Sequence, residues 1–390
     1  MKMNYKATIV ACFVGYIVQA IVNNFVPLLF ITFQNQFAIP LSQITLLVTF
    51  NFGVQLLVDM LSPLFVDRIG YRASIVLAHV CSAAGLILLT VLPGLMEPFA
   101  GILIAVMVYA IGGGIIEVLI SPIMESCPTE NKETAMSLLH SFYCWGHVGV
   151  VLLSTLFFAL AGIQNWRFLA CAWAVIPVLN AFVFLKTPIA PLLSEGEKGM
   201  GIIQLFASKT FWVLMLMMLC AGASEQAVSQ WASAFAEKGL GLSKALGDLA
   251  GPMAFAILMG SSRAFYGRYG ERIHLDKFML FSAVLCAASY LLISLAPHPL
   301  LSLAGCAVCG LSVGIMWPGT FNKAAAALRG GGTTMFALLA LAGDLGCSSG
   351  PSLVGFVSGL AGDNLKIGIM FALVFPILMI LCLKKNRKYA

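Results

Sequence analysis

Charged side chains are scarce in this chain. Only 10% of its 390 residues are Asp, Glu, Lys or Arg, whereas 60% are hydrophobic. Soluble domains carry about 25% charged and about 45–50% apolar residues, so this composition excludes an ordinary soluble protein. The chain is long enough for around twelve membrane helices of about 20–25 residues joined by short loops. We therefore expect an all-α integral membrane protein.

Sequence signals of enzymes are also missing. The chain has no nucleophile elbow, no metal-ligand spacing and no phosphate-binding glycine loop after a strand. Its eleven cysteines are irregularly spaced within apolar segments, which is typical of small core residues rather than a disulfide framework. The connecting segments are too short for a catalytic domain or for the output module of a sensor. We expect no enzyme activity, no cofactor, no metal and no nucleic-acid partner.

Long apolar runs predict the membrane helices, and the first run starts near Ala7 and is too long for a signal-peptide core. The predicted spans cover residues 7–35, 42–66, 72–92, 98–125, 132–162, 166–186, 208–237, 243–265, 274–296, 299–327, 332–361 and 365–384. If both termini are cytoplasmic, all but four of the 22 basic residues lie on the inner side; the exceptions are Arg167, Lys238, Lys244 and Lys366. This asymmetry predicts a multi-pass protein of the cell membrane with both termini cytoplasmic. It would lie among membrane lipids, and we expect it to be a monomer.

The longest connection divides the chain into two parts. Residues 187–207 contain Pro188, Pro191 and a Ser-Glu-Gly-Glu-Lys-Gly run, which indicates a cytoplasmic linker. We expect an N-terminal six-helix bundle at residues 1–186 and a C-terminal six-helix bundle at residues 208–390.

Short segments repeat between these two parts. The loop at residues 67–72 is similar to the loop at 267–272, and residues 145–149 parallel residues 342–346. Parallel repeats of this kind predict two pseudo-symmetric bundles with a site near the bilayer midplane between them.

The loop after the second span carries a family resemblance. It resembles the signature Gly-x-x-x-Asp-Arg-x-Gly-Arg-Arg of the major facilitator superfamily, and it departs from that signature at Pro63 and Tyr71. The resemblance implies that the chain has the fold of that superfamily and works by alternating access. It further implies that the loop packs against the cytoplasmic end of the eleventh span as a gate, although an ordinary charged turn is the alternative. The residues with this expected gating role are Asp67, Arg68, Gly70 and Arg72.

A narrower resemblance concerns the fourth span. The run from Gly112 to Glu117, with Ser121 and Pro122 after it, is similar to the fucose permease branch of sugar–proton symporters. That resemblance implies an essential role for Glu117. The branch also has an aspartate in the first span, and this chain departs from it there, with the amides Gln19, Asn23 and Asn24 instead.

Four carboxyl groups lie inside the apolar spans, at Asp59, Glu117, Glu225 and Asp344. An ionised carboxylate at bilayer depth costs about 2.5–3.5 kcal/mol even on insertion scales, so we expect these groups to have functions. Glu117, Glu225 and Asp344 are predicted near mid-depth, where they would bind substrate or the coupling ion. Asp59 lies nearer the cytoplasmic end of its span and is assigned to the gate.

Each central carboxyl group has its own context and alternative. The small, polar run at residues 222–226 around Glu225 would permit a break in the helix. Glu117 could instead be a permanently protonated structural donor. Asp344, flanked by Gly343 and Gly346, could instead form a structural pair with His147 of the fifth span.

Further polar and aromatic residues complete the predicted site. They are Gln19, Asn23 and Asn24 of the first span, Gln226 of the seventh, His147, and the aromatic residues Trp145 and Trp317. Hydrogen bonds between neighbouring helices are the alternative for the amides. Arg263 is assigned to the cytoplasmic end of its span, so no basic residue is expected near mid-depth. Such a site favours neutral or cationic cargo.

These patterns together predict a secondary transporter. The favoured function is proton-coupled symport of a small neutral solute, a sugar or polyol, with sodium left open as the coupling ion. The alternative is a proton-coupled antiporter that exports cationic or amphipathic drug-like compounds.

Overall fold

The structure is a computed structural model that describes residues 5–128, 132–189, 200, 202–270, 273–328 and 332–386. The side chains of a few helical positions in these ranges, including Asp67 and Arg68, lie outside the described part. Every regular element in the described ranges is helical. The chain divides into two compact units, Met1–Ser194 and Glu195–Ala390, and the division falls inside the predicted linker.

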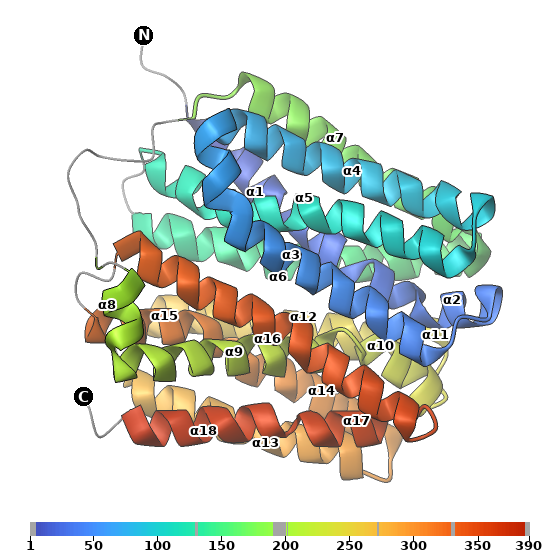
Figure 1. Ribbon diagram of the computed structural model, residues 1–390. Coiled ribbons are helices and arrows are strands. Elements are labelled where there is room, and N and C mark those ends of the chain that lie inside the picture. The colour runs from blue at the N-terminus through green and yellow to red at the C-terminus, as the bar shows by residue number, and fades with distance from the viewer. Residues whose placement is uncertain are drawn as a thin grey trace. The chain divides into compact units, whose positions relative to one another are not determined.

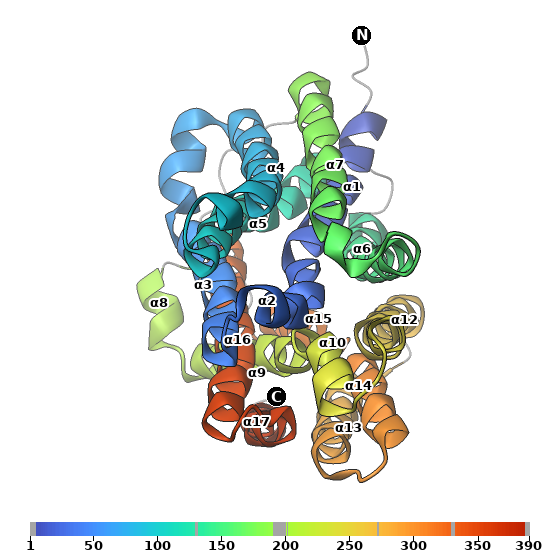
Figure 2. The same ribbon diagram turned by 90° about the vertical axis from the view of Figure 1, so that its right-hand side faces the viewer.

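Unit 1 contains the helices of the first six predicted spans. Its elements are α1 (Lys6–Asn24), the 3-10 turn η1 (Val26–Leu29), α2 (Phe30–Phe37), α3 (Leu41–Ile69), α4 (Tyr71–Leu95), α5 (Pro98–Ser126), α6 (Lys132–Ala161), the 3-10 turn η2 (Ile163–Asn165) and α7 (Trp166–Lys186). Figure 1 shows α4, α5 and α7 running side by side, and Figure 2 views the same helices close to end-on.

Unit 2 contains the helices of the other six spans. Its elements are α8 (Ile202–Ala207), α9 (Lys209–Ser229), α10 (Ala232–Ala234), η3 (Phe235–Gly239), α11 (Lys244–Asp248), η4 (Leu249–Met253), α12 (Ala254–Tyr269), α13 (Leu275–Leu295), α14 (Pro299–Val313), α15 (Met316–Ala327), α16 (Gly332–Leu360), α17 (Leu365–Ala372) and α18 (Val374–Asn386). The segments η3 and η4 are π-helical turns. The short helix α8 lies within the predicted linker.

The membrane spans agree with the expectation. In the described part of the chain, eleven helical segments are long and apolar enough to cross a membrane. The 29-residue α16 adds a twelfth, since it is about 43 Å long at 1.5 Å per residue and carries Asp344 as its only charged residue. The predicted all-α architecture with twelve spans in two helical bundles is therefore confirmed.

Glycines bring the helices of unit 1 into close contact. A Cβ atom added at Gly85 of α4 would lie 2.4 Å from the backbone nitrogen of Tyr109 in α5. One added at Gly112 of α5 would lie 2.4 Å from the carbonyl oxygen of Ala78 in α4. Neither position has room for a side chain, so the α4 and α5 backbones approach as closely as small residues permit.

A buried polar contact ties three helices of unit 1 together. Asn180 of α7 donates through Nδ2 to the carbonyl oxygen of Ala11 in α1 at 3.0 Å. The same nitrogen lies 2.8 Å from Nε2 of His79 in α4. All of these groups are buried, so their hydrogen bonds position α1, α4 and α7 relative to one another.

In unit 2 the closest contact joins α9 and α16, which lie side by side in Figure 1. A Cβ atom added at Gly346 would lie 2.0 Å from the carbonyl oxygen of Leu219. One added at Gly222 would lie 2.2 Å from the carbonyl oxygen of Gly343. The two helices therefore meet backbone against backbone.

The sequence predicted that a break in the helix could occur at residues 222–226, and the structure shows that this position is wrong. Helix α9 runs without interruption from Lys209 to Ser229, and the break falls at Gln230 and Trp231. Gly222 does not open the helix because α16 is packed directly against it. Within the break, the Trp231 indole donates to the carbonyl oxygen of Pro351 at 2.9 Å, which holds the turn in place.

Candidate functional site

The polar residues of unit 1 gather where α1, α3 and α5 meet. Gln19 and Asn23 are one helical turn apart on α1, and Asn51 and Gln55 are one turn apart on α3, so each pair shares a face. All four side chains are buried, and Glu117 of α5 is partly exposed. We call these five residues the amide cluster.

Side-chain hydrogen bonds connect the five residues of the amide cluster, and the donor in each of them is an amide N–H group. The Gln19 amide nitrogen donates to Glu117 Oε2 at 3.0 Å and to Gln55 Oε1 at 2.9 Å. Gln55 Nε2 then donates to Asn23 Oδ1 at 2.9 Å, and Asn51 Nδ2 donates to the same oxygen at 3.3 Å. Gln19 thus uses both hydrogens of its amide, one of them on the carboxyl group of Glu117.

Two acceptors of the amide cluster remain available. Gln19 Oε1 and Asn51 Oδ1 are buried and accept no hydrogen bond from the described residues. Gly113 packs closely against this region, because a Cβ atom there would lie 3.2 Å from both Gln19 Oε1 and Gln55 Oε1. Buried oxygens of this kind favour a ligand that donates hydrogen bonds, such as a hydroxylated solute or water.

Tyr16 and Asn24 of α1 make further polar contacts within unit 1. The Tyr16 hydroxyl is 2.9 Å from Ser121 Oγ on α5. Asn24 donates to the Ala20 carbonyl oxygen at 2.9 Å and to the Tyr143 hydroxyl at 3.4 Å. Asn24 therefore faces its own helix and α6 rather than the amide cluster.

The two predicted residues of α6 differ in environment. His147 is 2% exposed, and its neighbour Gly146 packs against α1, since a Cβ atom there would lie 3.0 Å from Ala20 Cβ. Trp145 is 49% exposed, in a stripe with Leu138 and Leu152, each one heptad away. Trp145 thus lies on an exposed apolar face of α6, apart from the amide cluster.

In unit 2, the carboxyl group of Glu225 forms an ion pair with Arg263. Glu225 of α9 accepts through Oε2 from Arg263 Nη2 at 3.1 Å and through Oε1 from Gln226 Nε2 at 3.2 Å. Gln230 Nε2 extends this chain to Gln226 Oε1 at 3.0 Å. The expectation of a site without a basic group is therefore wrong for this unit. Arg263 belongs to α12, and its long side chain carries the guanidinium group to Glu225.

Helices α15 and α16 of unit 2 meet at Trp317 and Gly343, the residue before Asp344. Asp344 is 5% exposed on α16. Its neighbour Gly343 contacts the Trp317 ring of α15, because a Cβ atom there would lie 2.2 Å from Trp317 Cη2. Because Gly343 has no side chain, the Trp317 indole can pack directly against the α16 backbone. The next residue in the chain, Asp344, carries the buried carboxyl group.

A second ionic cluster in unit 2 was missed from the sequence. Lys244 Nζ donates to both carboxylate oxygens of Asp248 at 2.9 Å, and Ser233 Oγ donates to the same carboxylate. Asp248 is fully buried between the π-helical turns η3 and η4. The spacing of four residues between Lys244 and Asp248 is the signal that could have indicated this pair.

The predicted gate is described only in part. Gly70 has φ of +83°, which favours glycine, and it separates α3 from α4. Arg72 Nη1 donates to the carbonyl oxygens of Phe184 and Leu185 at 2.9 and 2.7 Å, so it caps the end of α7 within its own unit. Asp59 lies in α3, inside the apolar part of that helix. The side chains of Asp67 and Arg68 lie outside the described residues, and contact with the eleventh span stays a prediction.

Twelve spanning helices in two units, with carboxyl groups held by amides and an arginine inside them, define a membrane transporter. The chain belongs to the Major Facilitator Superfamily, whose family model matches residues 9–351. No curated protein sequence matches the chain.

Solved structures of similar fold come from the same superfamily. The E. coli fucose:proton symporter FucP has a TM-score of 0.68 and 16% identity, with 98% of this chain and 99% of that chain covered. The D-xylose–proton symporter has a TM-score of 0.76 and 12% identity, with coverage of 97% and 96%. A bacterial homologue of the human lysosomal transporter Spinster, inward-facing, has a TM-score of 0.75 and 16% identity, with coverage of 100% and 98%. At these identities the likeness establishes the fold.

Proposed function

We propose that the protein is a proton-coupled symporter of a small, neutral, polyhydroxylated solute, with a sugar or polyol as the favoured substrate. The observation that carries this proposal is the hydrogen bond from Gln19 to Glu117 within a cluster of buried amides. It joins a carboxyl group that can bind a proton to groups that can bind hydroxyls.

Glu117 is the proposed proton site. As an ionised carboxylate it can only accept hydrogen bonds, which matches the donating amide of Gln19. A bound proton turns one acceptor oxygen into a donor, so Glu117 can then donate a hydrogen bond to a solute while its other oxygen still accepts from Gln19. That change is a direct physical link between proton binding and solute binding.

The amide cluster is the proposed solute site in unit 1. A hydroxyl group both donates and accepts, and it can therefore use the available oxygens of Gln19 and Asn51 as well as an amide N–H. Two neighbours of similar fold are named as proton symporters of fucose and D-xylose, which supports this substrate class.

The pairing of Glu225 with Arg263 supports symport of a neutral solute over export of cations. A cationic cargo would need an acid to balance its charge, and Glu225 already balances Arg263. Glu225, Gln226, Asp344 and Trp317 are proposed as the contribution of unit 2 to substrate binding, and His147 as a supporting residue of unit 1.

Uptake by proteoliposomes tests the function. An inward proton gradient should drive accumulation of a substrate sugar or polyol by the wild-type protein. Glu117→Gln should abolish accumulation while exchange of labelled for unlabelled solute continues, because exchange needs no net proton movement. Glu97→Gln makes the same change at the exposed start of α5 and should behave as wild type.

Two results would overturn the proposal. One is gradient-driven uptake by Glu117→Gln with the pH dependence of the wild-type protein. The other is efflux of lipophilic cations against the proton gradient, which would identify the antiporter alternative.

A further inference from the structure

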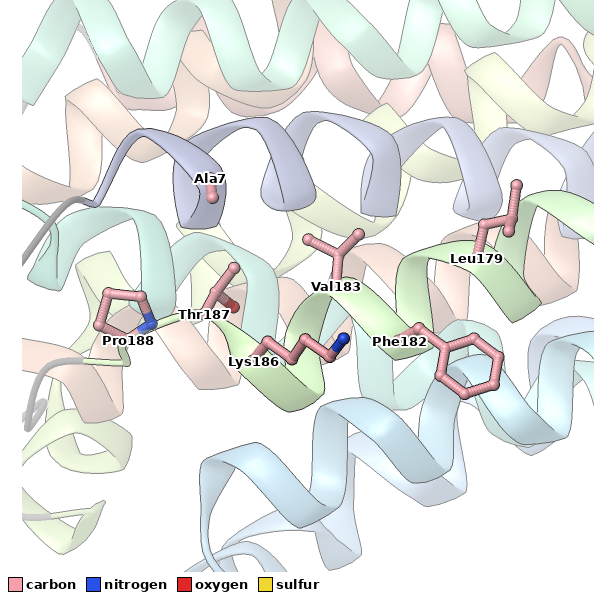
Figure 3. A pocket seen from close by; sticks show the side chains of 7 residues that line it. All are labelled: Ala7, Leu179, Phe182, Val183, Lys186, Thr187 and Pro188. Atoms are coloured by element: carbon pink, nitrogen blue, oxygen red, sulfur yellow. The ribbon is translucent and has the colours of Figure 1, made fainter.

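A cavity of about 600 Å³ lies at the surface of unit 1, and no residue of the amide cluster is among the described residues that line it. It is lined by Ala7 of α1, by Leu179, Phe182, Val183 and Lys186 of α7, and by Thr187 directly after that helix. Figure 3 shows the apolar residues along α7 and the two polar ones at its end.

The wall of this cavity is suited to hydrocarbon. Leu179 and Phe182 are 60% and 59% exposed, and Val183 is 39% exposed, within a helix that crosses the membrane. In a bilayer, these exposed apolar side chains contact acyl chains. An occupant of the cavity must therefore tolerate a lipid environment along most of its length.

The end of the cavity is polar and includes a buried hydroxyl. Thr187 is only 4% exposed, yet its Oγ1 makes no hydrogen bond with any described residue. The adjacent carbonyl oxygen of Pro188 is already bound by the Thr8 hydroxyl at 2.7 Å. Thr187 thus offers a hydrogen-bond donor that the described residues leave unused, and Lys186, the preceding residue, contributes an ammonium group to the lining of the cavity.

An anion at this position would ordinarily be repelled, because the C-terminal end of a helix carries a partial negative charge. Arg72 offsets that charge by donating to the Phe184 and Leu185 carbonyl oxygens in the last turn of α7. Among the described residues that line the cavity, none is acidic.

The geometry points to a binding site for one phospholipid with an acidic headgroup. Its phosphate accepts hydrogen bonds from Lys186 and Thr187, and one acyl chain lies along Phe182 and Leu179. A free phosphate ion would leave the apolar wall uncovered, which is why a lipid is the occupant assigned. The positive-inside asymmetry predicts that this end of α7 lies in the cytoplasmic leaflet, where acidic lipids concentrate.

Native mass spectrometry of the full-length protein in detergent tests the site. Titration with dioleoyl phosphatidylglycerol should give a tightly bound single lipid, whereas dioleoyl phosphatidylcholine should bind more weakly. Lys186→Gln and Thr187→Val should each reduce affinity for phosphatidylglycerol about fivefold, from loss of one charge or one hydrogen bond. Lys186→Arg keeps the charge and should retain binding.

Matched controls separate the site from general effects. Lys209→Gln removes an exposed lysine from unit 2, and Thr90→Val removes a hydroxyl that already donates to Ile87 in α4. Both should bind phosphatidylglycerol as the wild-type protein does. Thermal unfolding without lipid checks that each variant is folded.

The inference is overturned if both lipids bind equally well, or if Lys186→Gln and Thr187→Val bind phosphatidylglycerol as the wild-type protein does. It is also overturned if excess inorganic phosphate displaces the lipid, because the cavity would then be a phosphate site.

Discussion

At the scale of single residues, the amide cluster depends on a glycine. Gln19 Oε1 and Gln55 Oε1 lie so close to Gly113 that a side chain at this position would crowd them. A methyl group there would lie 3.0 Å from Val22 Cγ1 and 3.2 Å from each amide oxygen, so the amides must shift by a few tenths of an ångström. The protein fold should tolerate this change better than substrate binding does.

Gly113→Ala should therefore raise the KM for uptake about fivefold to tenfold, the equivalent of about one hydrogen bond, with little change in unfolding temperature. Uptake kinetics in proteoliposomes give the KM. Gly149→Ala on α6, where an added Cβ has no neighbour within 4 Å, is the control and should keep the wild-type KM. An unchanged KM in Gly113→Ala would show that the positions of the Gln19 and Gln55 oxygens do not matter for substrate binding.

The ion pair in unit 2 gives a second prediction at this scale. Arg263→Gln leaves Glu225 buried without its counter-charge, and removing one partner of a buried pair costs about 3–5 kcal/mol of unfolding free energy. The double variant Glu225→Gln, Arg263→Gln should recover much of that loss, because no lone charge remains. Denaturant unfolding of the purified protein measures both changes.

Lys238→Gln is the comparison, since Lys238 and Asp363 form an exposed pair with side chains 39% and 40% accessible. Its loss should cost at most about 1 kcal/mol. If Arg263→Gln behaves like Lys238→Gln, the pair with Glu225 is not a structural requirement.

At the scale of helices, the contact between α9 and α16 should be the least tolerant of added volume. Gly346→Ala places a methyl group against the Leu219 carbonyl oxygen, part of a backbone that cannot move aside. We expect a loss of about 1–3 kcal/mol in unfolding free energy, as for other overpacked cores. Gly359→Ala makes the same change in α16 where nothing lies within 4 Å, and it should not destabilise the protein. Equal stability of the two variants would contradict the backbone contact.

Much of the helical architecture was predictable from the sequence. Apolar length and interrupting charges predict the spans to within a few residues, because the bilayer demands continuous helices. The exact break after Ser229 was not predictable in this way, because α16 supports Gly222 from outside the segment. The composition of residues 222–226 gives no information about a helix from elsewhere in the chain that packs against them.

From the sequence, site residues could be predicted from their spacing along one helix, but contacts between different helices could not. Gln19, Asn23 and Glu117 could be selected from their spacing within spans, but Asn51 and Gln55 of α3 were overlooked although they are also one turn apart. The reach of Arg263 to Glu225 depends on how α9 and α12 pack, as does the burial of Asp248. Contacts between helices decide those features.

At the scale of the whole molecule, each unit has its own core and its own polar cluster. The predicted linker supplies the connection between them. We therefore expect that two co-expressed chains, residues 1–194 and 195–390, retain proton-driven uptake, because the cut falls outside both cores.

Uptake by cells that express both chains measures this result. A cut between Gly113 and Gly114 is the control, since it interrupts α5 beside the amide cluster and should abolish uptake. Loss of uptake with the linker cut, when both chains are present in the membrane, would show that an unbroken chain is required.

The backbone contact between α9 and α16 also has an evolutionary consequence. Most helix interfaces can be adjusted gradually, since one side chain can be exchanged for another of similar size. At Gly222 and Gly346 every possible exchange adds atoms where another backbone already lies. Selection for a new substrate should therefore leave these two positions unchanged, and the accepted substitutions should collect on the polar face of α9 around Gln226 and Gln230.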